Sequence, residues 1–96
     1  NKQLIDYLVE NIKKDKIYYN FNYEGSNFYL SLNRLNKKDR NRFIHISKIP
    51  ENRKYYYYFY NNVSNIKFKN LDDIEIVKEI YVDGVLINGV YKIYLN

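Results

Sequence analysis

Apolar residues at the start of the chain recur every three or four positions. Polar residues fill the positions between them, so one face of a helix would be apolar. Positive charge follows at Lys13 and Lys14, where it complements the negative end of a helix dipole. The pattern predicts an amphipathic helix over residues 2–14, and its apolar stripe consists of Leu4, Ile5, Leu8, Val9 and Ile12.

The period of the pattern then changes from 3.6 to 2, which is typical of half-buried strands. Residues 17–23 and 28–33 alternate in this way on either side of a loop that contains Gly25, so they predict a β-hairpin. The same alternation predicts a strand at 43–49, an aromatic strand at 55–60 and a short strand at 66–69. Pro50 to Asn52 carries the residues of a turn.

Two further segments and two turns complete the prediction. Residues 34–41 are polar and suit a loop or a frayed helical turn. Residues 71–80 fit either a helix start, with acidic residues after Asn70, or an alternating strand; we expect a helical turn at 71–75 that leads into a strand from about residue 76. Asp83-Gly84 and Asn88-Gly89 each lie between β-branched runs and each predict a hairpin turn.

Together these elements predict one α+β domain over residues 1–96. Its N-terminal helix would pack on an antiparallel β-meander of about five to seven strands. A chain of 96 residues is long enough for one hydrophobic core and too short for two.

The amino-acid composition indicates the cellular environment in which the protein is expected. The chain has no cysteine, so it has no disulfides, and a small domain without them is expected in a reducing cytoplasm. The longest apolar run, 55–60, is far too short to span a bilayer, and residues 1–16 lack the features of a signal peptide. Asparagine, lysine, isoleucine and tyrosine dominate, and their AT-rich codons indicate a low-GC bacterium or its mobile elements. We therefore expect a soluble cytoplasmic protein without a membrane partner.

Charge is unevenly spread along the chain, whose formal net charge is +5. Residues 34–54 hold eight basic residues against two acidic ones, whereas residues 70–96 hold five acidic against two basic. A basic loop beside tyrosines is one way to hold RNA or single-stranded DNA, although a solvated loop gives the same pattern. The residues that would contact nucleic acid are Arg34, Lys37, Lys38, Arg40 and Arg42.

Few residues suggest catalysis. His45, the only histidine, could act as a general base together with Lys48 and Tyr58 in a small nuclease or cyclic-nucleotide hydrolase. General acid–base chemistry needs two tuned groups, and a strand histidine without a catalytic role is the simpler interpretation. The glycines are solitary and the acidic residues lack the spacing of a calcium loop, so we expect no cofactor, no metal and no enzymatic activity.

The most unusual feature is the run of six aromatic residues at 55–60. Because successive strand side chains point to opposite faces, a single helix can cover only half of these rings. The exposed half would form a contact surface for a protein partner, and a second copy of the chain is one candidate. The sequence thus predicts a non-enzymatic protein-binding module, such as a phage- or mobile-element-encoded inhibitor of a host nucleoprotein. Its contact residues would be Tyr55, Tyr56, Tyr57, Tyr58, Phe59 and Tyr60.

Overall fold

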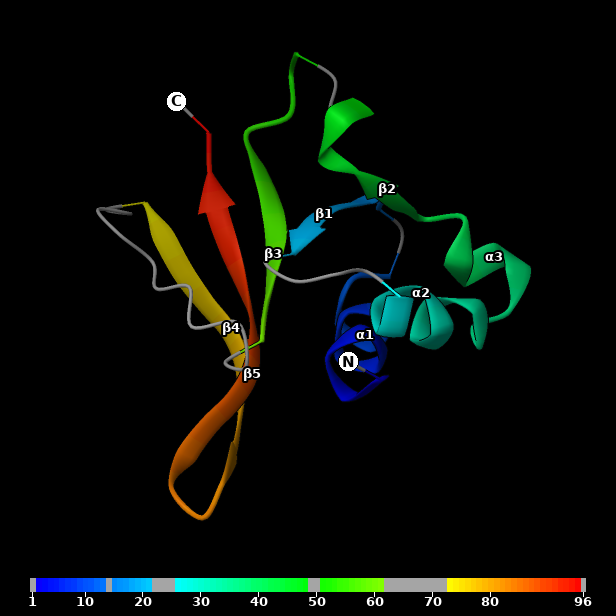
Figure 1. Cartoon of the computed structure of the whole chain (residues 1–96). Helices are drawn as coiled ribbons and strands as arrows, with labels where there is room; N and C mark the ends of the chain where they lie inside the picture. Colours follow the sequence, from blue (N-terminus) through cyan, green and yellow to red (C-terminus); the bar gives the residue numbers. More distant parts are fainter. Residues whose placement is uncertain (1, 14, 22–25, 49–50, 62–72, 96) are drawn as a thin grey trace.

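The protein folds into helices packed on a five-stranded sheet (Figure 1). The computed structural model describes residues 2–13, 15–21, 26–48, 51–61 and 73–95. In these residues the helices are α1 (Lys2–Asn11), α2 (Ser26–Asn33) and α3 (Lys37–Arg40), with a 3₁₀ turn η1 (Ile46–Lys48). The strands are β1 (Ile17–Phe21), β2 (Phe43–His45), β3 (Tyr55–Asn61), β4 (Ile74–Val82) and β5 (Val85–Tyr94). The predicted α+β class is confirmed.

The sheet is mixed, so the predicted antiparallel meander is only partly right. The strand order is β2-β1-β3-β5-β4. β1 runs parallel to both β2 and β3, while β5 is antiparallel to β3 and β4. Parallel neighbours need long crossover connections, and here α2 lies on the connection between β1 and β2.

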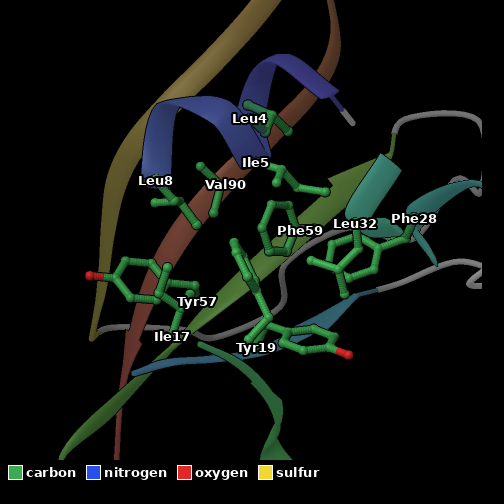
Figure 2. Close-up of a cluster of buried hydrophobic side chains, with 11 residues drawn as sticks. Leu4, Ile5, Leu8, Ile17, Tyr19, Phe28, Leu32, Tyr57, Phe59 and Val90 are labelled. Carbon is green, nitrogen blue, oxygen red and sulfur yellow. The ribbon is translucent and has the colours of Figure 1, made fainter. Parts of the chain in front are cut away.

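The core lies between α1, α2 and one face of the sheet. Leu4, Ile5 and Leu8 of α1 are fully buried, as the apolar stripe predicted. Figure 2 shows these side chains directed at Phe59 and Val90 of the central strands. The helix ends at Asn11, a little before the predicted residue 14.

The second hairpin strand predicted at 28–33 is wrong, because these residues form α2. Phe28 and Leu32 are buried in the core while Leu30 is 61% exposed. A strand would place all three on one face, whereas a helix buries positions four apart and turns the position between them to solvent. The predicted turn residues 24–25 lie outside the described residues.

Three other predictions need correction or refinement. The strand predicted at 43–49 ends at His45, and Ile46–Lys48 forms the 3₁₀ turn. β4 already begins at Ile74, so the favoured helical turn at 71–75 is wrong for the residues described and the alternative strand pattern is right. A helical turn is present within 34–41, where Asn36 caps α3 by accepting a hydrogen bond from the Asp39 amide.

The Asp83-Gly84 hairpin is confirmed, and the one at Asn88-Gly89 is wrong. Asp83 and Gly84 both have positive φ, 51° and 80°, as a tight turn between β4 and β5 requires. Asn88 and Gly89 instead lie inside β5 and pair with β3 and β4. The strand predicted at 66–69 lies outside the described residues. In the described part of the chain, no helix is long and apolar enough to cross a membrane.

Candidate binding surfaces

The aromatic run forms β3, the middle strand of the sheet, and its rings divide between the two faces as predicted. Tyr57 and Phe59 belong to the core beneath the helices. Tyr60, on the other face, is also buried and its ring lies 6.4 Å from that of Tyr91. Tyr55, Tyr56 and Tyr58 are half-buried, so only these three can contribute to a contact surface.

Burial also governs the ionisation of these tyrosines. It raises the pKa of Tyr56 and of Tyr58 above the ordinary value of 10.0, because a buried phenolate would lose its hydration. Both hydroxyls therefore stay protonated at neutral pH, and the run supplies packing area and neutral polar tips.

The predicted basic residues occupy different environments. Arg34, Lys37 and Lys38 are exposed on or beside α3, and Arg40 is half-buried. Arg42 is not a free surface cation, since its guanidinium donates hydrogen bonds to the carbonyl oxygens of Ile12 and Asp15. Its distance to the Asp39 carboxylate is 3.7 Å. Arg42 thereby fastens α3 to the chain between α1 and β1.

A basic cleft of about 540 Å³ opens beside this anchor. It brings Lys38 and Arg42 together with two lysines that the sequence analysis had not selected, Lys13 and Lys16. Of the described residues that line it, Asp15 alone is acidic. Proximity in the fold creates this group, because its members come from the connection between α1 and β1 and from α3 with the residues just after it.

Arg53 holds the other side of the Asp15 turn. Its guanidinium contacts the Asp15 carboxylate at 3.0 Å, donates to the Lys16 carbonyl and stacks 4.7 Å from the centre of the Tyr18 ring. The hydrogen bond from Arg53 is the main reason that the pKa of Asp15 lies below its ordinary value of 3.8. A smaller hollow of about 240 Å³ adjoins the cleft here and is lined by Asp15, Lys16, Tyr18, Asn52 and Arg53.

The end of the β4–β5 hairpin projects from the body of the protein (Figure 1). We call residues 80–87 the arm. The described residues of β3 pair with β5 only from Asn88 onward, so within the described sheet the arm is a ribbon of two strands. Tyr81, Val82 and Val85 are each 54% exposed, and Ile87 is exposed beside them.

An acidic groove of about 520 Å³ leads from the arm to α1. Among the described residues, three acidic residues, Asp6, Glu10 and Glu79, line it with one lysine, Lys78. The Asp6 carboxylate pairs with Lys2 at 3.0 Å, and the Glu79 carboxylate accepts hydrogen bonds from the Tyr81 and Tyr91 hydroxyls. The Lys78 ammonium lies 5.0 Å from the centre of the Tyr7 ring. Ile80 and Tyr81 of the arm supply apolar surface to the same groove, and Gln3 adds a polar amide.

Two of the residues suggested for acid–base catalysis, His45 and Tyr58, lie on opposite faces of the sheet. His45 pairs with Tyr19 on the helix-covered face, where its ring packs edge-on against the rings of Tyr19 and Phe21. Tyr58 points to the opposite face, because Tyr57 is the β3 residue beside Tyr19. The Ser47 amide donates to His45 Nδ1 at 3.3 Å, which further fixes the ring.

The described residues contain no group of three or more histidine, cysteine, aspartate or glutamate side chains that could hold a metal ion. Comparison with known proteins finds no matching family model, no matching curated protein and no matching solved structure. Function therefore has to be argued from the surfaces themselves.

Proposed function

We propose that this protein is a non-enzymatic binding module that holds a basic protein partner with its arm and acidic groove. The observation that carries the proposal is the exposure of four apolar side chains at the end of a projecting hairpin, with Val82, Val85 and Ile87 on one face and Tyr81 on the other. Large apolar side chains gathered on one exposed element are typical of protein-contact sites. A two-stranded ribbon is also barely stable by itself, so a partner that covers it stabilises it.

The charge around the arm decides what kind of partner fits. Asp83 lies at the tip of the arm, and Asp6, Glu10 and Glu79 line the groove behind it. Nucleic acid is disfavoured at this surface because its phosphates would face these carboxylates. A second copy docked arm to arm would bring Asp83 and Glu79 of both copies together, which is unfavourable for like charges. The complementary partner is a protein with apolar side chains and a basic rim.

Contact through side chains fits this hairpin better than addition of a strand to the sheet. Within the described sheet β4 is an edge strand, but its pairing with β5 shifts between Ile76 and Lys78 and again between Ile80 and Tyr81. Bulges and charged residues on an edge strand hinder its pairing with another chain. The exposed rings and methyl groups of the arm remain available.

Proteins with basic surfaces include those that hold nucleic acid. A small module that covered such a surface would compete with the nucleic acid and block the machine to which the surface belongs. This is the activity expected of an inhibitor of a nucleoprotein, and the AT-rich coding of the chain suits a phage or mobile element that encodes one.

Site-specific photo-crosslinking tests the proposal. A photoreactive amino acid replaces Val85 on the arm, and in a separate variant it replaces Leu30, which is equally accessible on α2. Both variants are irradiated in the lysate of a low-GC bacterium, and crosslinked proteins are identified by mass spectrometry. We expect Val85 to give a discrete adduct with a partner whose crosslinked region is basic, and Leu30 to give none.

Matched substitutions sharpen this result. Val82→Thr combined with Asp6→Asn and Glu10→Gln should reduce the Val85 adduct about tenfold or more, because contacts at the centre of an interface dominate its energy. Glu51→Gln, an exposed acidic position away from the groove, should leave the adduct unchanged. Adducts that consist only of a second copy of the chain, or the same mixed set from Val85 and Leu30, contradict the proposal.

A further inference from the structure

Among the described residues, the lining of the basic cleft holds four cations and one carboxylate, so its charge is only partly neutralised. Lys13, Lys16 and Lys38 are exposed and approach it from two segments, the connection between α1 and β1 and helix α3. Arg42 forms part of its lining, and the acceptors that hold its guanidinium against Ile12 and Asp15 are neutral carbonyl oxygens. These hydrogen bonds fix the position of the guanidinium without cancelling its charge. The cleft thus gathers four cations, which would repel one another without an anion between them.

Asp15 offsets little of this charge inside the cleft. Its carboxylate is engaged by Arg53, a fifth cation, at 3.0 Å. Asp39 is the other nearby carboxylate, and it lies 3.7 Å from Arg42 on the α3 side. The basic cleft therefore keeps a net positive charge. Its volume of about 540 Å³ is comparable with that of sites that hold a small ligand or part of a long one.

We infer that this cleft binds the phosphate groups of single-stranded nucleic acid. Lysine side chains on two walls can each meet a phosphate oxygen, and the counterions that they displace drive such binding. Arg42, which hydrogen bonds already hold in place, supplies a fixed positive charge beside these lysines. Only the lysine side chains then have to become ordered when a phosphate binds. The proposal rests on different residues from the arm, and either proposal can fail without the other.

The adjoining hollow favours a single strand over a duplex. It shares Asp15 and Lys16 with the cleft, so a strand whose phosphates lie in the cleft has a base beside Asn52 and Arg53. The Asn52 amide can donate to and accept from a base edge, and the Arg53 guanidinium, held beside the Tyr18 and Tyr55 rings, adds a fixed positive charge next to it. Paired bases in a duplex cannot turn their edges into such a hollow.

Fluorescence anisotropy with a labelled oligothymidylate of about ten nucleotides tests the inference, since sites for single strands span roughly 4–16 nucleotides. The variant Lys13→Ala/Lys16→Ala/Lys38→Ala should weaken binding about tenfold or more at low salt. It should also reduce the slope of log affinity against log salt by about 2, since each phosphate contact on a single strand contributes roughly 0.7.

The matched control is Lys2→Ala/Lys48→Ala/Lys54→Ala, which removes the same charge from exposed lysines that do not line the cleft. It should change affinity no more than about twofold. Asn52→Ala should weaken binding a few-fold and leave the salt slope unchanged, because a contact to a base displaces no counterion. Equal losses in the two lysine triples would show general attraction to a basic protein and overturn the inference.

Two further probes identify the ligand class. A duplex of the same length and heparin, a polyanion without bases, should each bind more weakly than the single strand. If either binds as tightly and loses affinity in the cleft triple, the cleft is a general polyanion site and the assignment to single-stranded nucleic acid is wrong.

Discussion

Two glycines of the hairpin are needed for different physical reasons. Gly84 has a φ of 80° and open space around the position where a Cβ would lie. Gly89 has no such backbone requirement, but a Cβ there would lie 2.8 Å from the hydroxyl oxygen of Tyr91. That hydroxyl donates a hydrogen bond of 2.7 Å to Glu79, the residue paired with Gly89 on the neighbouring strand. The Tyr91 ring therefore lies over Gly89 and is held there by Glu79.

Substitution by asparagine separates these two requirements. Gly84→Asn should lower the free energy of unfolding by only a few tenths of a kcal/mol, because asparagine tolerates positive φ. Gly89→Asn must displace the buried Tyr91 ring from Glu79 and should cost about 2–3 kcal/mol. Thermal and urea denaturation of the two variants measure the difference. Equal costs would mean that the ring can move aside freely.

Asp15 and Arg53 link a residue contact to the pH dependence of stability. Because the hydrogen bond from Arg53 lowers the pKa of Asp15 in the folded protein, the unfolded chain binds this proton more readily. The stabilisation is therefore fully present above the unfolded pKa and is lost as pH falls through the lower folded pKa. Asp15 is largely exposed, so the contribution is at most about 1 kcal/mol.

Asp15→Asn tests this linkage by urea denaturation across a pH series. The variant should be less stable than the parent at pH 5 to 7. The difference in their free energies of unfolding should shrink below about pH 4, near the ordinary aspartate pKa. The same variant removes the acidic residue lining the cleft, so it should bind the oligonucleotide more tightly while being less stable. A gap that stays constant down to pH 2 would contradict the role of Asp15.

At the scale of elements, α2 shows where a period of 2 and a helical period overlap. Phe28, Leu30 and Leu32 alternate with polar or aromatic neighbours, which predicts a strand. Phe28, Leu32 and Leu35 also recur at helical spacing, and these three are the ones that contact the core. Over eight residues the pattern alone does not distinguish a helix from a strand. The packing of Phe28 and Leu32 against β1 and β3 favours the helix.

Substitution at Leu30 and Leu32 distinguishes the two structures. Leu30→Glu should leave the free energy of unfolding within about 0.5 kcal/mol of the parent, because the side chain faces solvent. Leu32→Ala should cost about 2–4 kcal/mol through the cavity that it opens. Circular dichroism checks that both variants fold. A large cost at Leu30 would support the strand that the alternation predicted.

The local elements were more predictable than their arrangement. The stripe from Leu4 to Leu8, the alternation of 55–60 and the Asp83-Gly84 turn each identify an element, because each depends on neighbouring residues. Parallel pairing of β1 with β2 and β3 depends on where the chain crosses over, which no local period encodes. The basic cleft was missed for the same reason, since Lys13 and Lys38 become neighbours only when Arg42 ties the end of α3 to the chain that follows α1.

For the whole molecule, the uneven charge of the sequence becomes two separate surfaces. The acidic residues from 73 onward lie along β4 and the arm, and the basic cleft lies between the end of α1 and α3. Figure 1 places the arm and α3 on different sides of the protein. A partner that is itself bound to nucleic acid could therefore meet both surfaces at once, and two contacts on one partner strengthen each other through effective concentration.

The two surfaces should nevertheless act independently when each is probed alone. Val82→Thr/Val85→Thr should leave oligonucleotide affinity within about twofold of the parent, because residues so far apart and without shared contacts combine additively. The cleft lysine triple should leave the Val85 adduct unchanged.

Salt should also separate the two surfaces. Raising the salt concentration from about 50 to 200 mM weakens phosphate contacts at the cleft steeply, whereas the apolar part of the arm contact persists. If arm variants and cleft variants instead abolish the same interaction, with the same salt dependence, then one shared surface replaces the two argued from the charges and exposed side chains.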